Sequence, residues 1–383
     1  MNYSMIKIIR VITANYCIPA HLNNTLLRVP DGYQIYIIGD NVTAYAGVYE
    51  NVVFIDIPIQ RNFSFFTDIY AFIKLVFHFI RIKPDVVHSL MTKAGLFAAL
   101  AGKLTGVKIS LHTFTGQVWA NKKGLSRQLL KFVDKLICFF NTDCLTDSPS
   151  QSNYLFINGI GKNSRPLRCL MRGSLSGVDL ARFNRESLSK IHDELRIKLG
   201  LKETDFILGY IARKSLDKGC LDMLKIYLKI RQSYTNVKLI YIGPDESNGQ
   251  VSAFFDANPT LKEGVTNIGF VHNHAHYLGI CNILCLPSYR EGFGSIVIDA
   301  AALGITTVGY EIPGLVDSVV KDSTGKLVEC ADINAFVKVI EYFISNPNVL
   351  LEYSTRSRAS AVNFFDADLL NDSLYKVYRS LGL

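Results

Sequence analysis

The sequence predicts an α/β protein of two domains, each built on a parallel sheet with helices on both faces. The chain has 383 residues, which exceeds the size at which a single hydrophobic core stops growing. Strand-like and helix-like segments alternate along both halves, as is typical of parallel sheets. A segment rich in Gly and Ser, RGSLSGVDLARF at residues 172–183, separates the halves, so we place the domain boundary after residue 172.

The expected elements follow the chain in order. In the first half, strands are expected at residues 7–13, 34–39, 52–57, 85–88, 108–112 and 144–147, with helices at residues 67–80, 94–104 and 126–140. In the second half, strands are expected at residues 206–211, 238–242, 265–270, 283–286 and 306–309, with helices at residues 218–233, 295–303 and 333–345. Because ligands of such sheets bind at the carboxyl ends of the strands, the loops after His112, Ile211, Ile242 and Leu286 are the first places to look for function.

Charge is distributed unevenly along the chain. Residues 1–172 carry 19 Lys and Arg against 9 Asp and Glu, whereas residues 173–383 carry 22 against 24. One basic half and one nearly neutral half are expected where a single half faces an anionic partner. Nucleic acid and anionic lipid both fit that description. Because no zinc-finger, RRM or KH signature is visible, we expect no nucleic-acid partner.

Cysteine usage and hydropathy point to a reduced, cytosolic protein. The cysteines form no CxxC pair and no group with histidines at metal-ligand spacing, and we interpret Cys281 and Cys285, in the apolar run CNILC, as core residues. The N-terminus resembles a strand rather than a signal peptide. The longest apolar stretch, residues 64–80, is interrupted by polar groups and is shorter than the ~20 residues of a bilayer span, so we expect no membrane crossing.

The most informative motif is PSYREGFGSIVID at residues 287–299, where a turn joins an apolar strand to a helix. Gly292 and Gly294 allow the backbone to approach a ligand closely. The helix expected from Ser295 presents free N–H groups that favour an anion such as a diphosphate.

Two carboxylates flank this turn. Glu291 precedes it, and Asp299 lies one turn into the expected helix. Carboxylates placed in this way can accept hydrogen bonds from sugar and ribose hydroxyls. The alternative is an ordinary strand–turn–helix unit with acidic residues at its surface.

A second motif, IARKSLDKG at residues 211–219, follows the apolar strand FILGYI. Arg213 and Lys218 bracket a short loop at the strand's carboxyl end. Two such cations suit a pyrophosphate and the charge that develops on it as a leaving group. A solvated helix start is the alternative interpretation. Gly243, directly after the next expected strand, is a further candidate for donor binding.

The third motif is SLHTFTGQVWA at residues 110–120, which contains the chain's only tryptophan. His112 is expected to end a strand before a loop that includes Thr115 and a glycine. A neutral imidazole at this position can hydrogen-bond a sugar hydroxyl. A histidine satisfied within the core is the alternative.

The fourth feature is a basic helix that follows this loop. Its basic residues recur every four positions, at Lys123, Arg127, Lys131 and Lys135. Its apolar face is formed by Leu125, Leu129, Phe132, Val133 and Leu136. A basic amphipathic helix indicates binding to a membrane surface, whereas a packed helix with a solvated face is the alternative.

These motifs together resemble the retaining glycosyltransferases of family 4, which have the GT-B fold of two Rossmann-like domains facing across a cleft. The donor-site signature is R-x4-K-G at Arg213–Gly219 followed by an acidic pair, Glu291 and Asp299. Further similarity lies in KPDVVHS (83–89), HTFTGQVWA (112–120), SGVDLARF (176–183), the segment 287–315 and TGKLV (324–328). The string HTFTGQVWA most resembles bacterial O-antigen, capsule or glycoprotein enzymes that extend an undecaprenyl-diphosphate-linked N-acetylhexosamine, often through α-1,3 links.

The resemblance implies a domain plan. An acceptor-binding domain spans residues 1–172, a nucleotide-sugar-binding domain spans residues 173–365, and a C-terminal helix at residues 366–383 crosses back to the first domain. The partners implied are a UDP-linked sugar donor, a lipid-linked saccharide acceptor and the anionic cytoplasmic face of the inner membrane, where the protein would be peripheral.

The resemblance also implies roles for individual residues. Arg213 and Lys218 would clamp the donor diphosphate, Glu291 would contact the donor sugar, and Asp299 would bind the ribose hydroxyls. His112 would touch the far side of the sugar. Backbone amides in the turn would hold sugar and phosphate, which adds Gly292, Phe293, Gly294 and Ser295 to the donor site. The acceptor-side candidates are Asn15, His21, Thr115, Lys123 and Arg127.

Two departures from the family pattern stand out. The second acidic residue is Asp299 where family members usually carry Glu, so its carboxylate must act from one methylene further back. The loop at residues 13–21 (TANYCIPAH) lacks the usual paired glycines. The family reaction is usually drawn as a front-face substitution in which the leaving diphosphate helps to deprotonate the acceptor. With no DxD-like motif in a strand-end loop, we expect neither a metal nor a cofactor.

Two other functions fit the same sequence. A GT-B nucleotide-sugar epimerase would act on a free nucleotide sugar and need no lipid acceptor or basic membrane face. A non-catalytic nucleotide-sugar-binding scaffold is less favoured, because Arg213, Lys218 and Glu291 are all present. The donor and acceptor sugars, the linkage and the oligomeric state stay open at this point.

Overall fold

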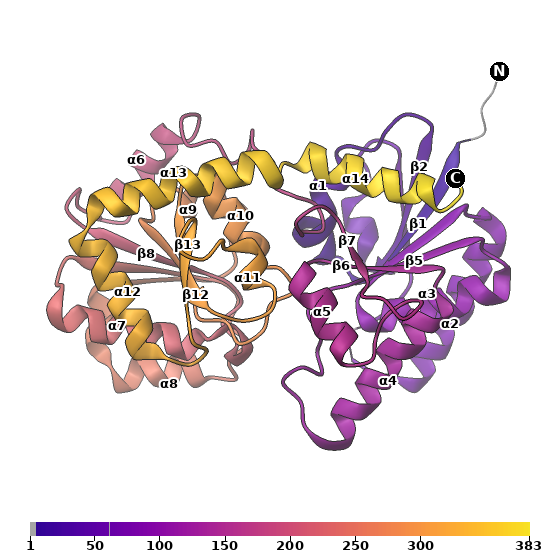
Figure 1. Cartoon of the computed structure of the whole chain (residues 1–383), viewed down its shortest axis with the longest axis horizontal. Coiled ribbons are helices and arrows are strands. Elements are labelled where there is room, and N and C mark those ends of the chain that lie inside the picture. Colours follow the sequence, from indigo (N-terminus) through magenta and orange to yellow (C-terminus); the bar gives the residue numbers. More distant parts are fainter. Residues whose placement is uncertain (1–4, 61) are drawn as a thin grey trace. The chain divides into compact units, whose positions relative to one another are not determined.

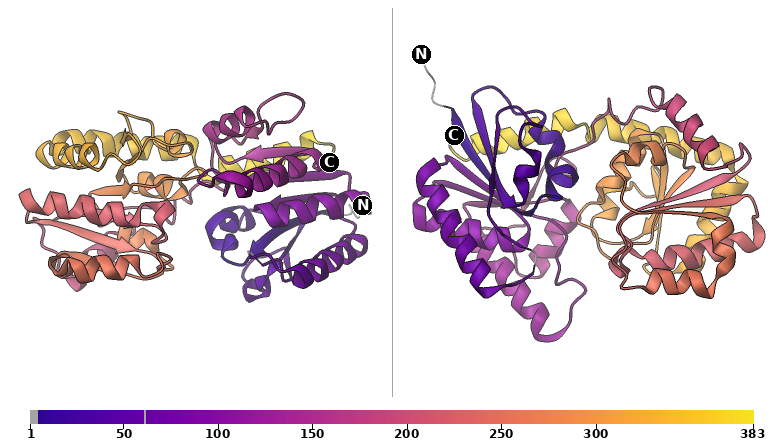
Figure 2. Two further views of the ribbon diagram at one scale, coloured as in Figure 1. Left: turned by 90° about the horizontal axis from the view of Figure 1, so that it is seen from below. Right: turned by 180° about the vertical axis from the view of Figure 1, so that it is seen from behind.

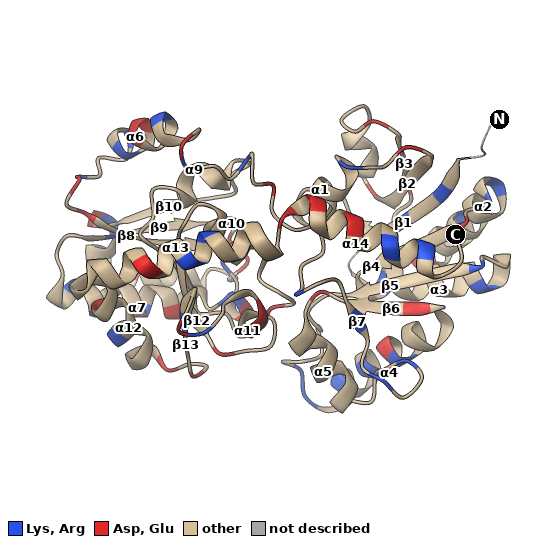
Figure 3. Cartoon of the chain, turned by 45° about the horizontal axis from the view of Figure 1, so that its top comes forward, with Lys and Arg blue, Asp and Glu red and all other residues tan. Residues whose placement is uncertain are grey.

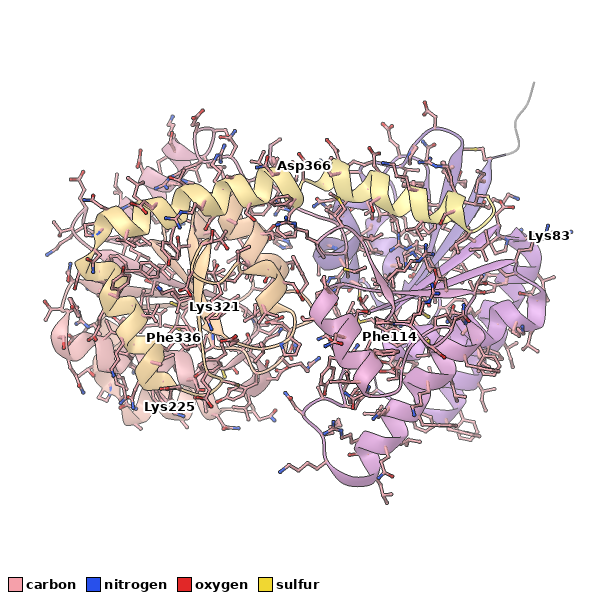
Figure 4. All side chains as sticks on the ribbon, viewed as in Figure 1. Lys83, Phe114, Lys225, Lys321, Phe336 and Asp366 are labelled. Carbon is pink, nitrogen blue, oxygen red and sulfur yellow. The ribbon has the colours of Figure 1, made fainter. Side chains whose placement is uncertain are left out.

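The computed structural model describes residues 5–60 and 62–383 and divides them into two compact units (Figure 1). The N-terminal unit runs to Gly177 and also contains Ala367–Leu383, and the C-terminal unit is Val178–Asp366. The boundary therefore lies after residue 177 rather than after residue 172. Asp366 lies at the break between the last two helices (Figure 4).

The N-terminal unit is built on a parallel sheet whose described strands have the order β3-β2-β1-β4-β5-β6-β7. The strands are β1 (Ile6–Ala14), β2 (Tyr33–Asp40), β3 (Val52–Asp56), β4 (Val86–Leu90), β5 (Ile109–Phe114), β6 (Asp143–Thr146) and β7 (Arg168–Cys169). The helices are a π-helical turn (Ile18–Leu22), α1 (Asn23–Leu26), a 3-10 turn (Val42–Tyr45), α2 (Phe65–Ile82), α3 (Thr92–Thr105), α4 (Gly124–Phe140), α5 (Pro149–Ile157) and α14 (Ala367–Ser380).

Alternate residues of β1 pack into different cores, because successive side chains of a strand point to opposite faces of the sheet. Ile8 and Ile12 belong to a buried cluster that includes residues of α1 and α14. Ile9 and Val11 belong to another cluster, with residues of α2 and α3. Helices therefore cover both faces of this sheet (Figure 2).

The C-terminal unit repeats the plan with the strand order β10-β9-β8-β11-β12-β13. The strands are β8 (Phe206–Ile211), β9 (Val237–Ile242), β10 (Val265–Ile268), β11 (Ile283–Leu286), β12 (Thr306–Tyr310) and β13 (Gly325–Val328). The helices are α6 (Ser189–Lys198), a 3-10 turn (Leu216–Lys218), α7 (Cys220–Ser233), α8 (Gln250–Ala257), a 3-10 turn (Pro259–Glu263), α9 (His274–Leu278), α10 (Ser295–Ala302), α11 (Leu315–Ser318), α12 (Ile333–Ser345) and α13 (Pro347–Phe364).

The two-domain α/β architecture predicted from the sequence is confirmed, and Cys281 and Cys285 are buried in the C-terminal core as expected. Two expected bounds are wrong at positions that matter. β5 continues to Phe114, so His112 lies inside the strand rather than at its end. α7 begins at Cys220, because Lys218 belongs to a 3-10 turn that ends in a left-handed residue.

The short strands β7 and β13 were not predicted. The long apolar segment around residues 64–80 forms α2. Within residues 5–60 and 62–383, no helix combines the length and the apolar character needed to span a bilayer.

Candidate active site

The loop after β8 and the loop after β11 meet through an ion pair. Lys218 Nζ lies 2.6 Å from Glu291 Oε2 and also donates to the backbone carbonyl of Arg290 at 3.3 Å. Both side chains of the ion pair are largely buried. The pair joins the two motifs that the sequence singled out separately.

The backbone around Lys218 explains how this meeting is possible. Gly219 has φ +66°, and a Cβ atom there would lie 1.8 Å from the carbonyl oxygen of Pro287. Only glycine allows the turn to approach the end of β11 so closely. Tyr210, buried on β8, donates its hydroxyl to the carbonyls of Arg213 (3.0 Å) and Lys218 (3.1 Å). Tyr210 therefore fixes the loop that carries both cations.

Arg213 is held by carboxylates at the same end of the sheet. Its guanidinium pairs with Glu246, in the loop after β9, and lies 3.8 Å from Asp217. Arg290 also binds Asp217, at 2.8 Å. Burial opposes ionisation of Asp217, but a hydrogen bond from Ser215 and the charge of Arg290 lower its pKa below the usual value. The two arginines are therefore oriented by an ionised carboxylate between them.

The predicted donor turn has the expected form, with α10 beginning at Ser295 directly after Gly294. The Ser295 side chain is exposed, whereas the Phe293 side chain is buried and packs against Phe365 at 5.4 Å between ring centroids. Gly292 lies between Glu291 and the buried Phe293. Phe293 can therefore present only its backbone to a ligand, and its side chain holds the turn on the core.

The Asp299 carboxylate contacts a histidine side chain. Its Oδ2 lies 2.9 Å from Nε2 of His274, the first residue of α9. The His274 ring also lies 5.3 Å from the ring of Phe183. The imidazole fixes the orientation of a carboxylate whose side chain is one methylene shorter than the family glutamate.

Gly243, expected among the donor-binding residues, has a packing role in the structure. It has φ +146°, and a Cβ atom there would lie 1.8 Å from the carbonyl oxygen of Ala212. Glycine at this position therefore allows the ends of β8 and β9 to lie side by side, which brings Glu246 within reach of Arg213.

In the N-terminal unit, His112 is buried on β5. Its Nδ1 lies 2.9 Å from Ser89 Oγ on β4, and its ring packs on Phe114 at 4.5 Å between centroids. Gly95 of α3 leaves room for this ring, since a Cβ atom there would lie 2.5 Å from His112 Cε1. Burial lowers the pKa of His112 to about 3, so the imidazole is neutral at physiological pH. The expectation of a neutral imidazole fits this environment, whereas the expectation of a strand-end position does not.

Three of the acceptor-side candidates follow strands β1 and β5, which lie on either side of β4 in the sheet. Asn15 follows β1 and accepts a backbone hydrogen bond from Ile18, and His21 lies in the π-helical turn. Thr115 follows β5 and contacts the sulfur of Met91 at 3.9 Å. Met91, which sequence reasoning missed, has φ +70° at the end of β4. Non-glycine residues held at positive φ store strain and occur often at ligand sites.

Lys123 and Arg127 occupy different surroundings at the start of α4. Lys123 is exposed at the residue before the helix. Arg127 and Lys131 lie over the ring of Trp119, at 5.6 and 5.8 Å from its centroid. Trp119 is buried and donates its indole N–H to Asp134 at 2.7 Å. Two of the four residues of the predicted basic stripe, Arg127 and Lys131, therefore pack on Trp119.

Three residues that position the site, Tyr210, Glu246 and His274, were not predicted. In the sequence, Tyr210 cannot be distinguished from the other residues of the apolar strand FILGYI, and Glu246 cannot be distinguished from an ordinary acidic residue in a loop. His274 had a usable signal, because it follows an expected strand in the histidine-rich run HNHAH.

Known proteins resemble this chain in sequence. Residues 192–360 match the family described as "Glycosyl transferases group 1". The capsular polysaccharide biosynthesis glycosyltransferase CapM of Staphylococcus aureus is 25% identical over 374 residues, covering 98% of this chain and 97% of CapM. The UDP-Gal:alpha-D-GlcNAc-diphosphoundecaprenol alpha-1,3-galactosyltransferase of Escherichia coli is 24% identical over 83% of this chain and 81% of its own length.

Solved structures show the same fold. Anabaena HepE in complex with UDP and glucose aligns with a TM-score of 0.82 at 16% identity, covering 98% of this chain and all of HepE. Sucrose-phosphate synthase from Thermosynechococcus elongatus aligns with a TM-score of 0.81 at 18% identity, covering 98% of this chain and 99% of that structure. With its two Rossmann-like units the chain has the GT-B fold, and residues 192–360 within it match the group 1 glycosyltransferase family.

Proposed function

We propose that this protein is a glycosyltransferase that moves an N-acetylhexosamine from a UDP-linked donor, with retention of configuration, to an undecaprenyl-diphosphate-linked saccharide in surface polysaccharide or glycoprotein glycan assembly. The observation that carries the donor half of the proposal is the Lys218–Glu291 pair, with Arg213 in the same loop. Two cations and a carboxylate therefore lie near the carboxyl ends of β8 and β11, where ligands of parallel sheets bind.

In the proposed reaction, charge stabilisation does most of the work. As the bond between the sugar and the diphosphate breaks, negative charge grows on the leaving group. Lys218 and Arg213 are already oriented by carboxylates, so they can stabilise that charge without rearranging at the moment of reaction. Glu291 would hold the donor sugar, and Asp299, oriented by His274, would bind the ribose hydroxyls. The acceptor hydroxyl would attack the anomeric carbon as the bond to the diphosphate breaks, and the leaving diphosphate would take the hydroxyl proton, so the chain need supply neither a nucleophile nor a general base.

The proposed reaction needs no metal ion, because Arg213 and Lys218 supply the positive charge that metal-dependent transferases draw from a cation. We therefore expect turnover to survive saturating EDTA. Loss of turnover in EDTA that Mg²⁺ or Mn²⁺ restores would contradict this part of the proposal.

The names of relatives support a UDP-linked donor, a lipid-linked acceptor and a role in surface polysaccharide synthesis. HepE was solved with UDP, the E. coli relative is named for transfer to a diphosphoundecaprenol acceptor, and CapM is named for capsule synthesis. A lipid-linked acceptor places the reaction at a bilayer surface, so we propose a peripheral position at the cytoplasmic face of the inner membrane.

A donor panel tests the proposal directly. UDP- and GDP-linked sugars are incubated with the protein, with and without a polyprenyl-diphosphate-linked N-acetylhexosamine, and the products are analysed by mass spectrometry and NMR. The proposal expects transfer only when the acceptor is present, from a UDP-linked sugar, with the anomeric configuration retained. An epimerised free UDP-sugar would instead identify an epimerase, and donor binding without turnover on any acceptor would identify a scaffold.

A further inference from the structure

Helix α2 is apolar on two opposite sides. Its inward side buries Ala71, Leu75 and Phe79 in the N-terminal core. On the opposite side, a second apolar stripe is exposed at helical spacing: Phe66, Ile69, Tyr70, Ile73, Phe77 and Ile80. Phe66, for example, is 83% exposed. A surface helix of a globular protein normally carries polar residues on its outer side, so this stripe requires an explanation.

Helix α4 repeats the arrangement. It buries Asp134, Ile137 and Cys138 on its inward side. Its opposite side exposes Leu125, Leu129, Phe132 and Phe139, of which Leu125 is 83% exposed. The apolar face that the sequence predicted for this helix therefore points away from the core.

The two exposed stripes belong to one layer of the N-terminal unit. Both α2 and α4 pack against α3, and all three helices cover the same face of the sheet (Figures 1 and 2). The buried sides of α2 and α4 face this sheet, so both exposed stripes form the outer surface of the layer. We call the outer sides of α2 and α4 the α2/α4 face.

Charge around the α2/α4 face is predominantly positive. Residues 62–140, whose charged residues are coloured in Figure 3, include 11 Lys and Arg but only three Asp. Two of these acids are buried: Asp68 binds Lys93, and Asp134 binds the indole of Trp119. The third, Asp85, accepts a hydrogen bond from the backbone of Lys7.

Basic groups border the apolar stripe of α2. Lys74 and Arg81 are exposed along one flank of the helix, and the Lys74 ammonium lies over the ring of Tyr70 at 5.6 Å. Lys83 follows the helix at the outer edge of the unit (Figure 4). Long basic side chains at this position can reach lipid head groups while the aromatic rings between them enter the acyl region.

We propose that the α2/α4 face docks on an anionic lipid bilayer. The inference rests on the proposed function only in that a lipid-linked acceptor must be met at a membrane, and it assigns the surface that would meet it. A bilayer suits the face better than a protein partner, because the face combines aromatic and aliphatic side chains with a basic border and no exposed acid on either helix. The proposal shifts the main contact from the α4 basic stripe, half of which packs on Trp119, to the apolar side of α2.

The test is vesicle flotation of the full chain. The key variant carries Phe66→Gln, Ile73→Gln and Phe77→Gln, which changes the exposed stripe and leaves the buried one intact. The matched control carries Ile197→Gln and Leu351→Gln, two exposed apolar residues of the C-terminal unit. Vesicles of phosphatidylethanolamine with phosphatidylglycerol are compared with vesicles of phosphatidylcholine alone.

We expect the parent and the control to bind the anionic vesicles and the triple variant to bind them at least about tenfold more weakly, since three apolar side chains lose their burial. Binding to phosphatidylcholine should be weaker than to the anionic vesicles for the parent. Thermal unfolding and transfer to a short water-soluble acceptor should be the same for all three proteins, so a failure of the proposed function would appear in the transfer assay alone.

Equal binding of the triple variant and the parent to anionic vesicles would overturn the proposal, as would a parent that does not bind them. A parent that self-associates in sedimentation equilibrium and ignores vesicles, with a monomeric triple variant, would show that the face is an interface between copies of the chain.

Discussion

Two uncharged neighbours, Gly219 and Tyr210, fix the position of Lys218. The glycine after it and the hydroxyl of Tyr210 bring its backbone to the end of β11, and Glu291 then holds its ammonium at 2.6 Å. The R-x4-K-G spacing predicted the two cations. It could not predict that the lysine, rather than the arginine, is the partner of Glu291, because that depends on the fold of the turn.

Replacing Lys218 by Ala should weaken donor binding and turnover. A charge-assisted contact is worth about 1.5–3 kcal/mol, so we expect kcat/KM for the donor to fall by about 10- to 150-fold. The fall in kcat should exceed the rise in KM if the contact strengthens on the leaving group. Lys225→Ala, on α7 but outside the site, is the control and should retain parental kinetics. If the Lys218→Ala protein retains parental activity, this loop is not part of the active site.

His274 and Asp299 should behave as one unit. Asp299→Ala removes the carboxylate expected to bind the ribose, and His274→Ala removes the group that orients it. We expect the first change to raise the donor KM by about tenfold or more and the second by less. The double variant should be no worse than Asp299→Ala, because residues that share one contact are not additive. With a donor that contains 2′-deoxyribose, either change should raise KM by a smaller factor. If the two changes have fully additive effects on KM with the natural donor, His274 does not act through Asp299.

At the scale of elements, helix α14 shows how a segment remote in sequence becomes part of a domain. Tyr378 of α14 hydrogen-bonds to His88 Nδ1 at 2.7 Å and accepts from Arg10 at 3.3 Å, and His88 Nε2 lies 2.7 Å from Thr113. The helix also buries Leu370 and Leu374 in the N-terminal core. The resemblance to family 4 implied a C-terminal helix that crosses back to the first domain, but the polar network beneath it required the fold.

Strands β8 and β11 and helix α12 were predicted to the residue, because β8 and β11 are apolar runs and α12 is strongly amphipathic. Strand β7 has only two residues, too few to show a period of two, and β13 (GKLV), although as long as β11, has only two apolar residues. For α4 the amphipathic pattern was predicted but its orientation was not. Periodicity identifies an apolar side, and only the packing of Asp134 and Ile137 shows which side is inward.

The anchoring of α4 should depend on pH through Asp134. Burial raises the pKa of this carboxyl to about 7, although the hydrogen bond from Trp119 opposes the shift. A carboxyl whose folded-state pKa lies above its unfolded value stabilises the fold fully below the unfolded pKa, and that contribution is lost as the pH rises through about 7. We expect urea unfolding, followed by fluorescence of the single tryptophan, to require less urea at pH 8 than at pH 5.

The isosteric change Asp134→Asn keeps an acceptor for the Trp119 indole but cannot ionise. Its unfolding midpoint should therefore vary less between pH 5 and pH 8 than that of the parent. The same pH dependence in both proteins would assign the effect to other groups.

At the scale of the whole molecule, the proposed donor site and the basic apolar surface lie in different units. The cations and carboxylates around Lys218 belong to the C-terminal unit, which has its own core, whereas the α2/α4 face belongs to the N-terminal unit. The charge tally of the two halves predicted this division. The residues of the α2/α4 face, above all those on the exposed side of α2, could not be identified until the structure showed which side of each helix is buried.

Hydrogen exchange should reveal the two functions separately. A ligand protects the segments whose local opening it suppresses, so UDP should slow exchange in peptides covering residues 213–219, 243–246 and 291–299. Anionic vesicles should instead slow exchange in peptides from α2 and α4, at Phe65–Ile82 and Gly124–Phe140. The Lys218→Ala protein should lose only the first pattern, and the protein with Phe66, Ile73 and Phe77 changed to Gln should lose only the second. Protection by vesicles that spreads over the C-terminal loops and spares α2 would mean that the bilayer contacts a different surface, whereas UDP protection confined to the N-terminal unit would relocate the donor site.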